Sequence, residues 1–278
     1  MGTRMRRSGE RDLKGKVVLL SGATGGIGTA LAFAFGDAGA RLILLDLDPD
    51  ALAKLASRLE ARGVESRTAV CDVRAESACD AAVRVAEEAF GGVDVVIANA
   101  GISHRSLFVD TEPEVLRRVM DVNFFGAVNL VRAGLASVRA RRGQLIAISS
   151  VAGFAPLVGR TGYAASKHAL HGFFDSLRSE LHDAGVDVMV VCPAFTDTRL
   201  AQNALSGDGH ELGDATRATA GGAMTPEHVA DAVLRAARRR RRLLPISPIA
   251  HASLWLARLA PRLYERVMLS KQGGEFRS

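Results

Sequence analysis

A short apolar run that leads directly into closely spaced glycines constrains the fold of this chain more than any other feature. Residues 16–21 are aliphatic and β-branched, which is typical of a buried parallel strand. The segment 22–28 reads Gly-Ala-Thr-Gly-Gly-Ile-Gly, and an alanine-rich helical pattern follows from Thr29 to about Ala38. A glycine-rich turn alone could be a plain connection. Placed between strand and helix, it predicts a nucleotide site whose phosphates lie at the helix N-terminus.

Strand-like and helix-like segments alternate along the rest of the chain. The further predicted strands are residues 41–46, 65–71, 93–98, 144–149, 186–192 and 243–246. Repeated β–α–β units imply a mostly parallel sheet that is covered by helices on both faces. We therefore expect an α/β fold, a doubly wound parallel sheet of about seven strands.

No linker or internal repeat interrupts this alternation, so the sequence predicts one domain over residues 13–246. Residues 1–12 are basic and polar and are interpreted as a flexible tail. Residues 247–278 form a C-terminal extension beyond the alternating core.

An acidic residue ends the second predicted strand. Asp46 follows the glycines by about 20 residues, where a carboxylate accepts hydrogen bonds from the hydroxyls of an adenosine ribose. The same carboxylate would repel a 2′-phosphate, and the turn offers no arginine or lysine to bind one. Asp46 therefore favours NAD over NADP, the alternative being an exposed acid that caps the next helix.

Tyr163 and Lys167 are four residues apart, and Ser150 lies thirteen residues before Tyr163. On a helix, positions four apart share one face. An ammonium beside a phenol lowers the pKa of the phenol, and a nearby serine hydroxyl could hold a substrate oxygen. The trio suggests acid–base chemistry on an alcohol or carbonyl. The alternative to a catalytic role is that Tyr163 is simply half-buried on a surface helix.

These motifs occur together in the order and spacing of a known family. The shared features are the glycine turn, Asp72-Val73, Asn99-Ala100-Gly101, Asn123, Ser150 and Tyr163-x-x-x-Lys167. From about Leu13 to Ile246 the chain closely resembles the short-chain dehydrogenase/reductase family. Such a set is far more specific than any one of its members.

The resemblance implies a catalytic set of Asn123, Ser150, Tyr163 and Lys167, with Asn123 completing a proton relay through a bound water. Read singly, Asn123 could equally be a helix kink or a satisfied buried amide. Cofactor contacts are implied for Gly22, Thr24, Gly26, Ile27, Gly28, Asp46, Asp72, Val73, Asn99, Ala100, Gly101, Tyr163, Lys167, Pro193, Thr196 and Thr198. Substrate contacts are expected from Ser150, Phe154, Tyr163, Phe195 and Leu200, with Leu157 also a candidate; the apolar ones could instead be plain core.

Two positions depart from the family pattern. Ser21 stands where the family usually has threonine, which keeps the hydroxyl. Ala194 replaces a glycine after the sixth strand, and an alanine there would be strained if the position needs a positive φ.

The function expected from these residues is an NAD-dependent interconversion of a secondary alcohol and a ketone, on an apolar or lipid-like substrate. An NADPH-dependent 3-oxoacyl reductase is the alternative within enzymes. A non-catalytic nucleotide-sensing protein on the same fold is the alternative from another class. Relatives of that kind usually lose the tyrosine or lysine.

The net charge of +6 owes much to five consecutive arginines at residues 238–242. Such a run can bind anionic lipid or nucleic acid, but it also suits the C-terminal end of a helix that starts with Thr225 as cap and Pro226 first. No interleaved aromatic residues offer a stacking surface, so nucleic acid is the least favoured partner.

Cys71, Cys79 and Cys192 form no disulfide framework, which suits a reducing compartment. His168 and His171 are too few for a metal site, and none is expected. With no signal-peptide pattern, the expected location is the cytoplasm, with membrane association open.

The extension carries apolar residues at helical spacing over residues 249–268, with arginines between them and a break at Pro261. It could cover the substrate pocket, form an oligomer interface or lie on a membrane surface. Residues 195–224 are expected to form a mobile substrate loop. By the resemblance, a homodimer or homotetramer would assemble through helices at 112–139 and 163–184.

Overall fold

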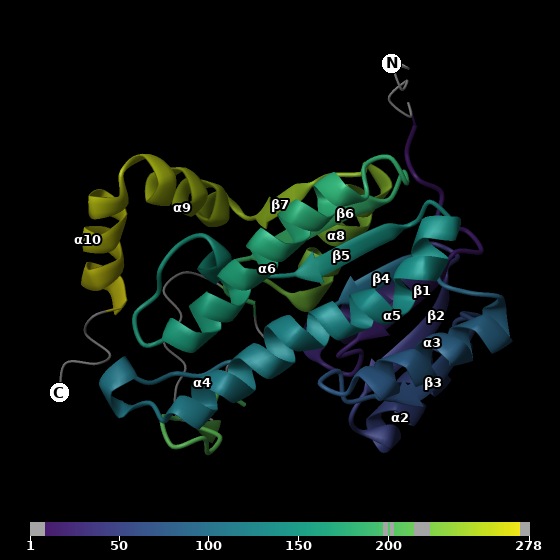
Figure 1. Ribbon diagram of the computed structural model, residues 1–278, viewed down its shortest axis with the longest axis horizontal. Helices are drawn as coiled ribbons and strands as arrows, with labels where there is room; N and C mark the ends of the chain where they lie inside the picture. Colours follow the sequence, from purple (N-terminus) through teal and green to yellow (C-terminus); the bar gives the residue numbers. More distant parts are fainter. Residues whose placement is uncertain (1–8, 197–199, 201–202, 214–222, 273–278) are drawn as a thin grey trace.

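A single seven-stranded parallel sheet forms the centre of the computed structural model, which describes residues 9–196, 200, 203–213 and 223–272 (Figure 1). The strand order is β3-β2-β1-β4-β5-β6-β7, and every neighbouring pair is parallel. The strands are β1 (Val17–Ser21), β2 (Arg41–Asp46), β3 (Ser66–Val70), β4 (Val95–Ala98), β5 (Gln144–Ile148), β6 (Asp187–Pro193) and β7 (Leu243–Ile246). The predicted doubly wound α/β fold is confirmed.

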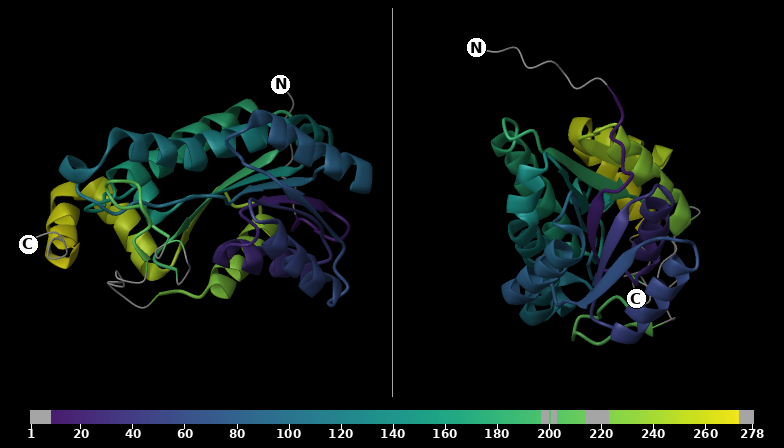
Figure 2. Two further views of the ribbon diagram at one scale, coloured as in Figure 1. Left: turned by 90° about the horizontal axis from the view of Figure 1, so that it is seen from below. Right: turned by 90° about the vertical axis from the view of Figure 1, so that its right-hand side faces the viewer.

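Helices cover both faces of the sheet (Figure 2). One face carries α1 (Gly26–Asp37), α2 (Pro49–Glu60) and α8 (Pro226–Arg238). The other carries α3 (Glu76–Phe90), α5 (Gly126–Ala140) and α6 (Thr161–Glu180), with α4 (Pro113–Met120) running into α5 through a π-helical turn. The long strand-to-strand crossovers place these helices, as parallel pairing requires.

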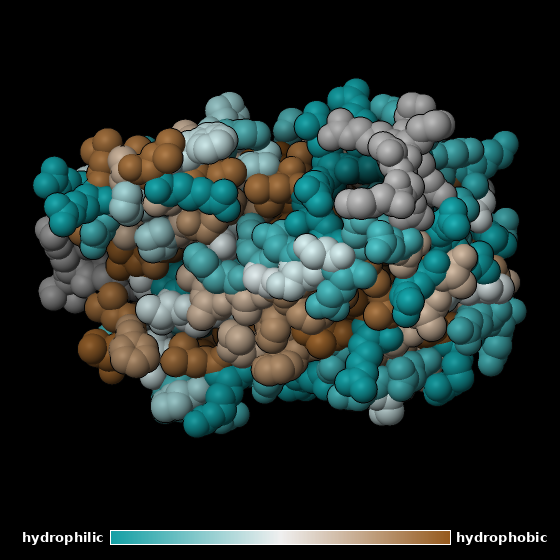
Figure 3. All heavy atoms as spheres, turned by 45° about the horizontal axis from the view of Figure 1, so that its top comes forward, coloured by the Kyte–Doolittle hydropathy of each residue, from teal (hydrophilic) through white to brown (hydrophobic). Residues whose placement is uncertain are grey.

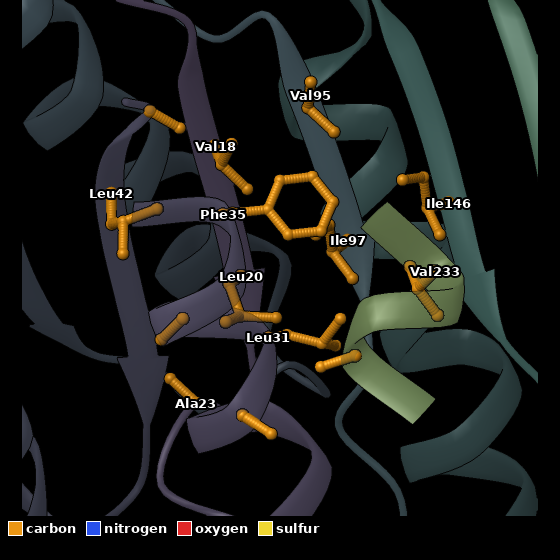
Figure 4. Packing of buried hydrophobic residues seen from close by; sticks show 14 of the residues in the cluster. Val18, Leu20, Ala23, Leu31, Phe35, Leu42, Val95, Ile97, Ile146 and Val233 are labelled. Carbon is orange, nitrogen blue, oxygen red and sulfur yellow. The ribbon is translucent and has the colours of Figure 1, made fainter. Parts of the chain in front are cut away.

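Core packing beneath α1 determines where this helix lies on the sheet. Phe35 and Leu31 project from α1 onto the sheet, where they lie beside Val18 of β1 and Ile97 of β4 (Figure 4). All four side chains are fully buried, and removing a ring such as that of Phe35 typically costs about 3–5 kcal/mol. Packing thus holds α1 against β1 and β4, with its N-terminus at their carboxyl ends.

The predicted element boundaries agree with the structure to within two residues for the strands. The cap predicted at Thr225 is confirmed, because its hydroxyl accepts a hydrogen bond from the His228 N–H at 3.2 Å. The glycine-rich helix begins earlier than expected, at Gly26 instead of Thr29. The last glycines are therefore part of the first helical turn.

Arg11 corrects the expectation of a flexible tail up to residue 12. Its side chain is buried, and Nη2 lies 2.6 Å from the Asp187 carboxylate and donates to the Gly143 carbonyl. Arg240 reaches the same carboxylate at 2.7 Å. Part of the basic run therefore joins the N-terminal segment to β6, which supports the helix-end interpretation.

The extension folds into two short helices, α9 (Pro248–Leu259) and α10 (Pro261–Gln272), separated at the predicted Pro261. Tyr264 anchors this hairpin by donating its hydroxyl hydrogen to the Pro156 carbonyl at 3.1 Å. Among the described residues, no helix has the length and apolar character needed to cross a membrane.

Candidate active site

The glycine turn lies where the strand order reverses, between β1 and its neighbours β2 and β4. Open parallel sheets bind ligands at this point. Gly22 has φ +63°, and a β-carbon on it would lie 2.9 Å from the Ala100 Cα. A β-carbon on Gly28 would lie 2.0 Å from the Gly22 carbonyl oxygen. Both glycines are therefore required by close backbone approach.

Ser21 and Asn99 join this turn to the end of β4. The Ser21 hydroxyl accepts hydrogen bonds from the N–H groups of Asn99 and Ala100, each at 3.1 Å. The Asn99 amide donates to the carbonyls of Ser21 and Gly22, each at 3.0 Å. A serine hydroxyl is thus sufficient at the position where the family usually has threonine.

Asp46 closes the other side of the turn. Its Oδ2 accepts hydrogen bonds from the Thr24 hydroxyl at 2.6 Å and from the Thr24 N–H at 2.9 Å. Oδ1 accepts one from the Leu47 N–H at 2.8 Å. The carboxylate is fixed beside the glycine turn and does not cap α2, whose N-terminal N–H groups are bound by Asp48.

The N-terminus of α1 has the features of a phosphate site. Its N-cap is Gly25, no side chain caps the helix, and its first turn contains no acidic residue. The first N–H groups of such a helix lack intrahelical partners and carry partial positive charge. With Asp46 beside them, these residues fit a pyrophosphate joined to an adenosine ribose.

Asp72 and Val73 follow β3 at the same edge of the sheet. Asp72 forms an ion pair with Arg74, at 2.6 Å, which lowers the pKa of the carboxyl group. Val73 is buried, and its carbonyl accepts a hydrogen bond from the Asn129 amide. The contact of both residues with an adenine stays a prediction.

Tyr163 and Lys167 lie on one face of α6, as their spacing predicted. The ammonium lies 5.6 Å from the centre of the Tyr163 ring and donates to the Ile148 carbonyl at 3.0 Å. It is also close to Gly101, since a β-carbon there would lie 3.5 Å from Nζ. Burial lowers the pKa of Lys167 to about 8.

The pKa of Tyr163 differs in direction from the sequence-based expectation. Burial raises it, while a hydrogen bond with Ser150 and the charge of Arg160 act in the opposite sense. The Lys167 ammonium donates to the Ile148 carbonyl while it lies over the ring of Tyr163. The net shift of the Tyr163 pKa is therefore upward, which is opposite to the lowering expected from the sequence.

Ser150 begins the short 3₁₀ turn after β5, where its Oγ accepts a hydrogen bond from the Ala152 N–H at 3.1 Å. Asn123 is buried within the π-helical turn (Asp121–Phe125). Its amide is bonded to both backbone groups of Ile102 and to the Ser166 hydroxyl, at 2.8 to 2.9 Å. Asn123 therefore lies in a helix irregularity and has a fully bonded side-chain amide, as the two non-catalytic alternatives expected. Its role in a proton relay stays a prediction.

The segment after β6 supplies the remaining predicted contacts. Pro193 ends the strand, and Thr196 forms an isolated bridge with Met224. The φ angle of Ala194 is not positive, so the alanine at this position is not strained. Thr198 lies outside the residues that the structure describes.

The candidate substrate residues divide into two groups. Phe154 packs against the core and meets the His171 ring edge to face, with ring centres 6.0 Å apart, which favours a core role. Phe195, two residues after the end of β6, and Leu200 are each 36% exposed. The second pair is available to line an apolar pocket.

Two polar residues near the site were missed by the sequence analysis. His104 is fully buried, and neither ring nitrogen has a hydrogen-bond partner among the described residues. Arg160 donates to the Ser103 hydroxyl at 2.8 Å and influences Tyr163. The sequence signal that could have identified them is position, because His104 follows β4 closely and Arg160 lies three residues before Tyr163.

Comparison with known proteins yields consistent matches. A family model described as short chain dehydrogenase matches residues 16–209. The chain is 39% identical over 274 residues to dehydrogenase/reductase SDR family member 7B of Bos taurus, covering 96% of this chain and 84% of the relative.

Two solved structures share the fold. One is a short-chain dehydrogenase/reductase of Burkholderia phymatum in complex with NAD, with TM-score 0.81 and 27% identity, covering 91% of this chain and 96% of the other. An alcohol dehydrogenase of Thermococcus sibiricus complexed with 5-hydroxy-NADP has TM-score 0.72 and 26% identity, covering 82% and 94%.

Proposed function

Because the chain belongs to the short-chain dehydrogenase/reductase family, we propose that it is an NAD-dependent oxidoreductase that interconverts a secondary alcohol and a ketone. The observation that carries this proposal is the convergence of Ser150, Tyr163 and Lys167 beside the end of β4 and the glycine turn. When bound, NAD supplies the acceptor or donor of hydride.

The protein's own residues handle the oxygen and its proton. Ser150 donates a hydrogen bond to the substrate oxygen, and the Tyr163 hydroxyl gives or takes the proton at that oxygen. Lys167 holds positive charge beside the phenol ring and favours the phenolate while that proton moves. Burial of Tyr163 and Lys167 keeps water from the reacting atoms.

The proposed preference for NAD rests on Asp46. Its carboxylate lies beside the turn that would hold the pyrophosphate, and a 2′-phosphate placed there would meet negative charge. The solved relatives hold NAD in one case and an NADP derivative in the other, so they favour neither. The same carboxylate counts against the NADPH-linked 3-oxoacyl reductase.

The proposed substrate is apolar or lipid-like. Phe195 and Leu200, in the segment that follows β6, offer exposed apolar surface for such a substrate. Retention of the whole catalytic set disfavours a non-catalytic sensor. A screen of steroids, retinol, aliphatic secondary alcohols and polyols with NAD would identify the class.

Replacing Tyr163 tests the reaction itself. We expect Tyr163→Phe to reduce turnover about 10²–10⁴-fold, the usual contribution of a positioned acid or base, while NAD still binds. Tyr264→Phe is the matched control, because Tyr264 is the other tyrosine of the chain and holds only the hairpin. Full turnover in Tyr163→Phe, with NAD binding intact in both variants, would overturn the proposed function.

A further inference from the structure

The helical hairpin α9–α10 concentrates exposed apolar side chains. Six of the thirteen exposed large hydrophobic residues in the described part of the chain belong to it, between 39% and 77% exposed. They are Ile249, Trp255, Leu259, Leu263, Val267 and Leu269. Exposed apolar residues are normal when scattered, but a cluster of this kind marks a surface that binds something.

The hairpin has an inner and an outer side. Ala250, Leu254 and Tyr264 are buried against the body of the protein. Trp255 and Leu259, one helical turn apart, point outward with exposures of 59% and 77%. The outer residues are thus surplus to the packing that holds the hairpin in place.

Cationic side chains accompany these apolar ones. Arg258, Arg262, Arg266 and Lys271 are all exposed, against the single acid Glu265 within both helices. Arg262 and Arg266 form one stripe, and Leu263 and Val267 form the adjacent stripe. Within the described part of the chain, no ion pair neutralises the three arginines. Adjoining apolar and cationic stripes are the pattern of helices that lie in the interface of a bilayer.

The surface extends beyond the hairpin. The segment that precedes α4 lies at the same end of the molecule as α10 (Figures 1 and 2), and it carries the exposed Phe108 and Val109. Figure 3 shows brown, hydrophobic residues gathered with teal ones at this end. Two segments more than a hundred residues apart thus present apolar groups in one region.

We propose that the outer face of α9–α10 docks on an anionic lipid bilayer. A second copy of this chain is a poorer occupant, because a twofold interface places the same patch on itself and would bring arginines against arginines. An anionic bilayer supplies both the apolar layer for Trp255 and Leu259 and the negative charge for the guanidinium groups. This proposal goes beyond the proposed function, and its test measures binding instead of turnover.

Trp255 makes the test direct, because it is the sole tryptophan of the chain and lies on the proposed face. We expect its emission to shift to shorter wavelength when vesicles of phosphatidylglycerol and phosphatidylcholine are added to the full chain. Vesicles of phosphatidylcholine alone should give a much weaker shift, and added salt should reverse the effect. An absent shift, or an equal shift with both vesicles, would overturn the proposal.

Matched variants separate this face from net charge. Arg258→Gln, Arg262→Gln and Arg266→Gln combined should weaken vesicle affinity about 100-fold, since each arginine contributes about fivefold. The same triple change at exposed Arg84, Arg132 and Arg139 alters the charge equally and should have little effect.

Apolar variants complete the design. Leu259→Glu with Leu263→Glu should abolish vesicle binding, whereas Leu47→Glu with Val70→Glu, at similarly exposed positions elsewhere, should not. Equal losses in the hairpin and control variants would refute docking through α9–α10. An emission shift that grows with protein concentration in the absence of vesicles would identify a second copy as the occupant and refute the bilayer.

Discussion

Three hydrogen bonds fix the orientation of the Asp46 carboxylate. Thr24 contributes two donors to one carboxylate oxygen, and the Leu47 N–H binds the other. A carboxylate held in this way would need no reorganisation to accept the hydroxyls of a ribose at the proposed cofactor site. We therefore propose that cofactor selectivity depends on Asp46 and its immediate hydrogen bonds.

We expect Asp46→Asn to lower the ratio of kcat/KM for NADH over NADPH by about 10- to 100-fold. That range corresponds to the ~1.5–3 kcal/mol of a charge-assisted hydrogen bond. Steady-state kinetics with both cofactors provides the measurement. Asp48→Asn is the control, because Asp48 caps α2 and asparagine caps equally well. An unchanged ratio in Asp46→Asn would remove the basis for NAD preference.

We expect His104 to make the stability of the protein depend on pH. Burial and the charge of Arg160 lower its pKa from 6.5 to about 4. As the pH falls, His104 therefore binds a proton near pH 6.5 in the unfolded chain but only near pH 4 in the folded protein. Because the unfolded state binds more protons in this window, stability present above pH 6.5 is lost as the pH falls toward 4.

We expect His104→Leu to remove about 2–3 kcal/mol of the acid-induced loss in unfolding free energy between pH 7.5 and 4.5. At pH 7.5 the variant should be close to wild type, since neither ring nitrogen has a described partner to lose. Urea unfolding at both pH values measures this. Exposed His228→Leu controls for the loss of an imidazole. Identical pH dependence in His104→Leu and wild type would contradict the assignment.

At the scale of elements, Gly28 in the first turn of α1 leaves no room for a side chain. A β-carbon on Gly28 would meet the Gly22 carbonyl at 2.0 Å, whereas Gly172 in α6 has nothing within 4 Å. We expect Gly28→Ala to destabilise the protein by about 1–3 kcal/mol and to abolish NAD binding. Gly172→Ala should stabilise it by about 0.5–1 kcal/mol through helix propensity. Thermal unfolding and NAD titration would show the contrast, and equal effects would refute it.

The strands, and the placement of Tyr163 and Lys167 on one face of α6, were predictable because their signals are local. Apolar runs marked the strands other than β3, whose sequence Ser-Arg-Thr-Ala-Val is mostly polar, and a spacing of four marked the helix face of Tyr163 and Lys167. Contacts between distant segments were not predictable, such as the ion pair of Arg11 with Asp187, 176 residues away. The pKa of Tyr163 shifted against expectation for the same reason, because its burial depends on packing that no short window of sequence records.

At the scale of the whole molecule, structural ion pairs lie at the amino ends of the strands and the candidate site lies at their carboxyl ends. Arg11 and Arg240 meet Asp187 at the amino end of β6. The glycine turn, Tyr163 and the α9–α10 hairpin lie toward the carboxyl ends of the strands. Tyr264 links the hairpin to the loop between Ser150 and α6. The proposed bilayer contact would therefore bring the loop that follows Ser150 close to lipid.

The outer surface of α6 and of the continuous helix formed by α4, the π-helical turn and α5 is the predicted oligomer interface. Phe125 lies between α4 and α5 with 50% of its surface exposed, and its ring packs edge to face against Phe124. An exposed aromatic ring on a long helical surface is typical of an interface anchor.

We expect the wild-type chain to form a dimer or tetramer and Phe125→Glu to shift it toward monomer, because a buried charge at a twofold contact faces its own copy. Size-exclusion chromatography with light scattering measures the mass. Phe108→Glu is the control, since Phe108 is 65% exposed but lies in the segment before α4. If Phe125→Glu kept the wild-type mass while Phe108→Glu lowered it, the subunits would meet at the end that carries the hairpin. The bilayer and a second copy would then compete for one surface, and vesicle binding would fall as protein concentration rises.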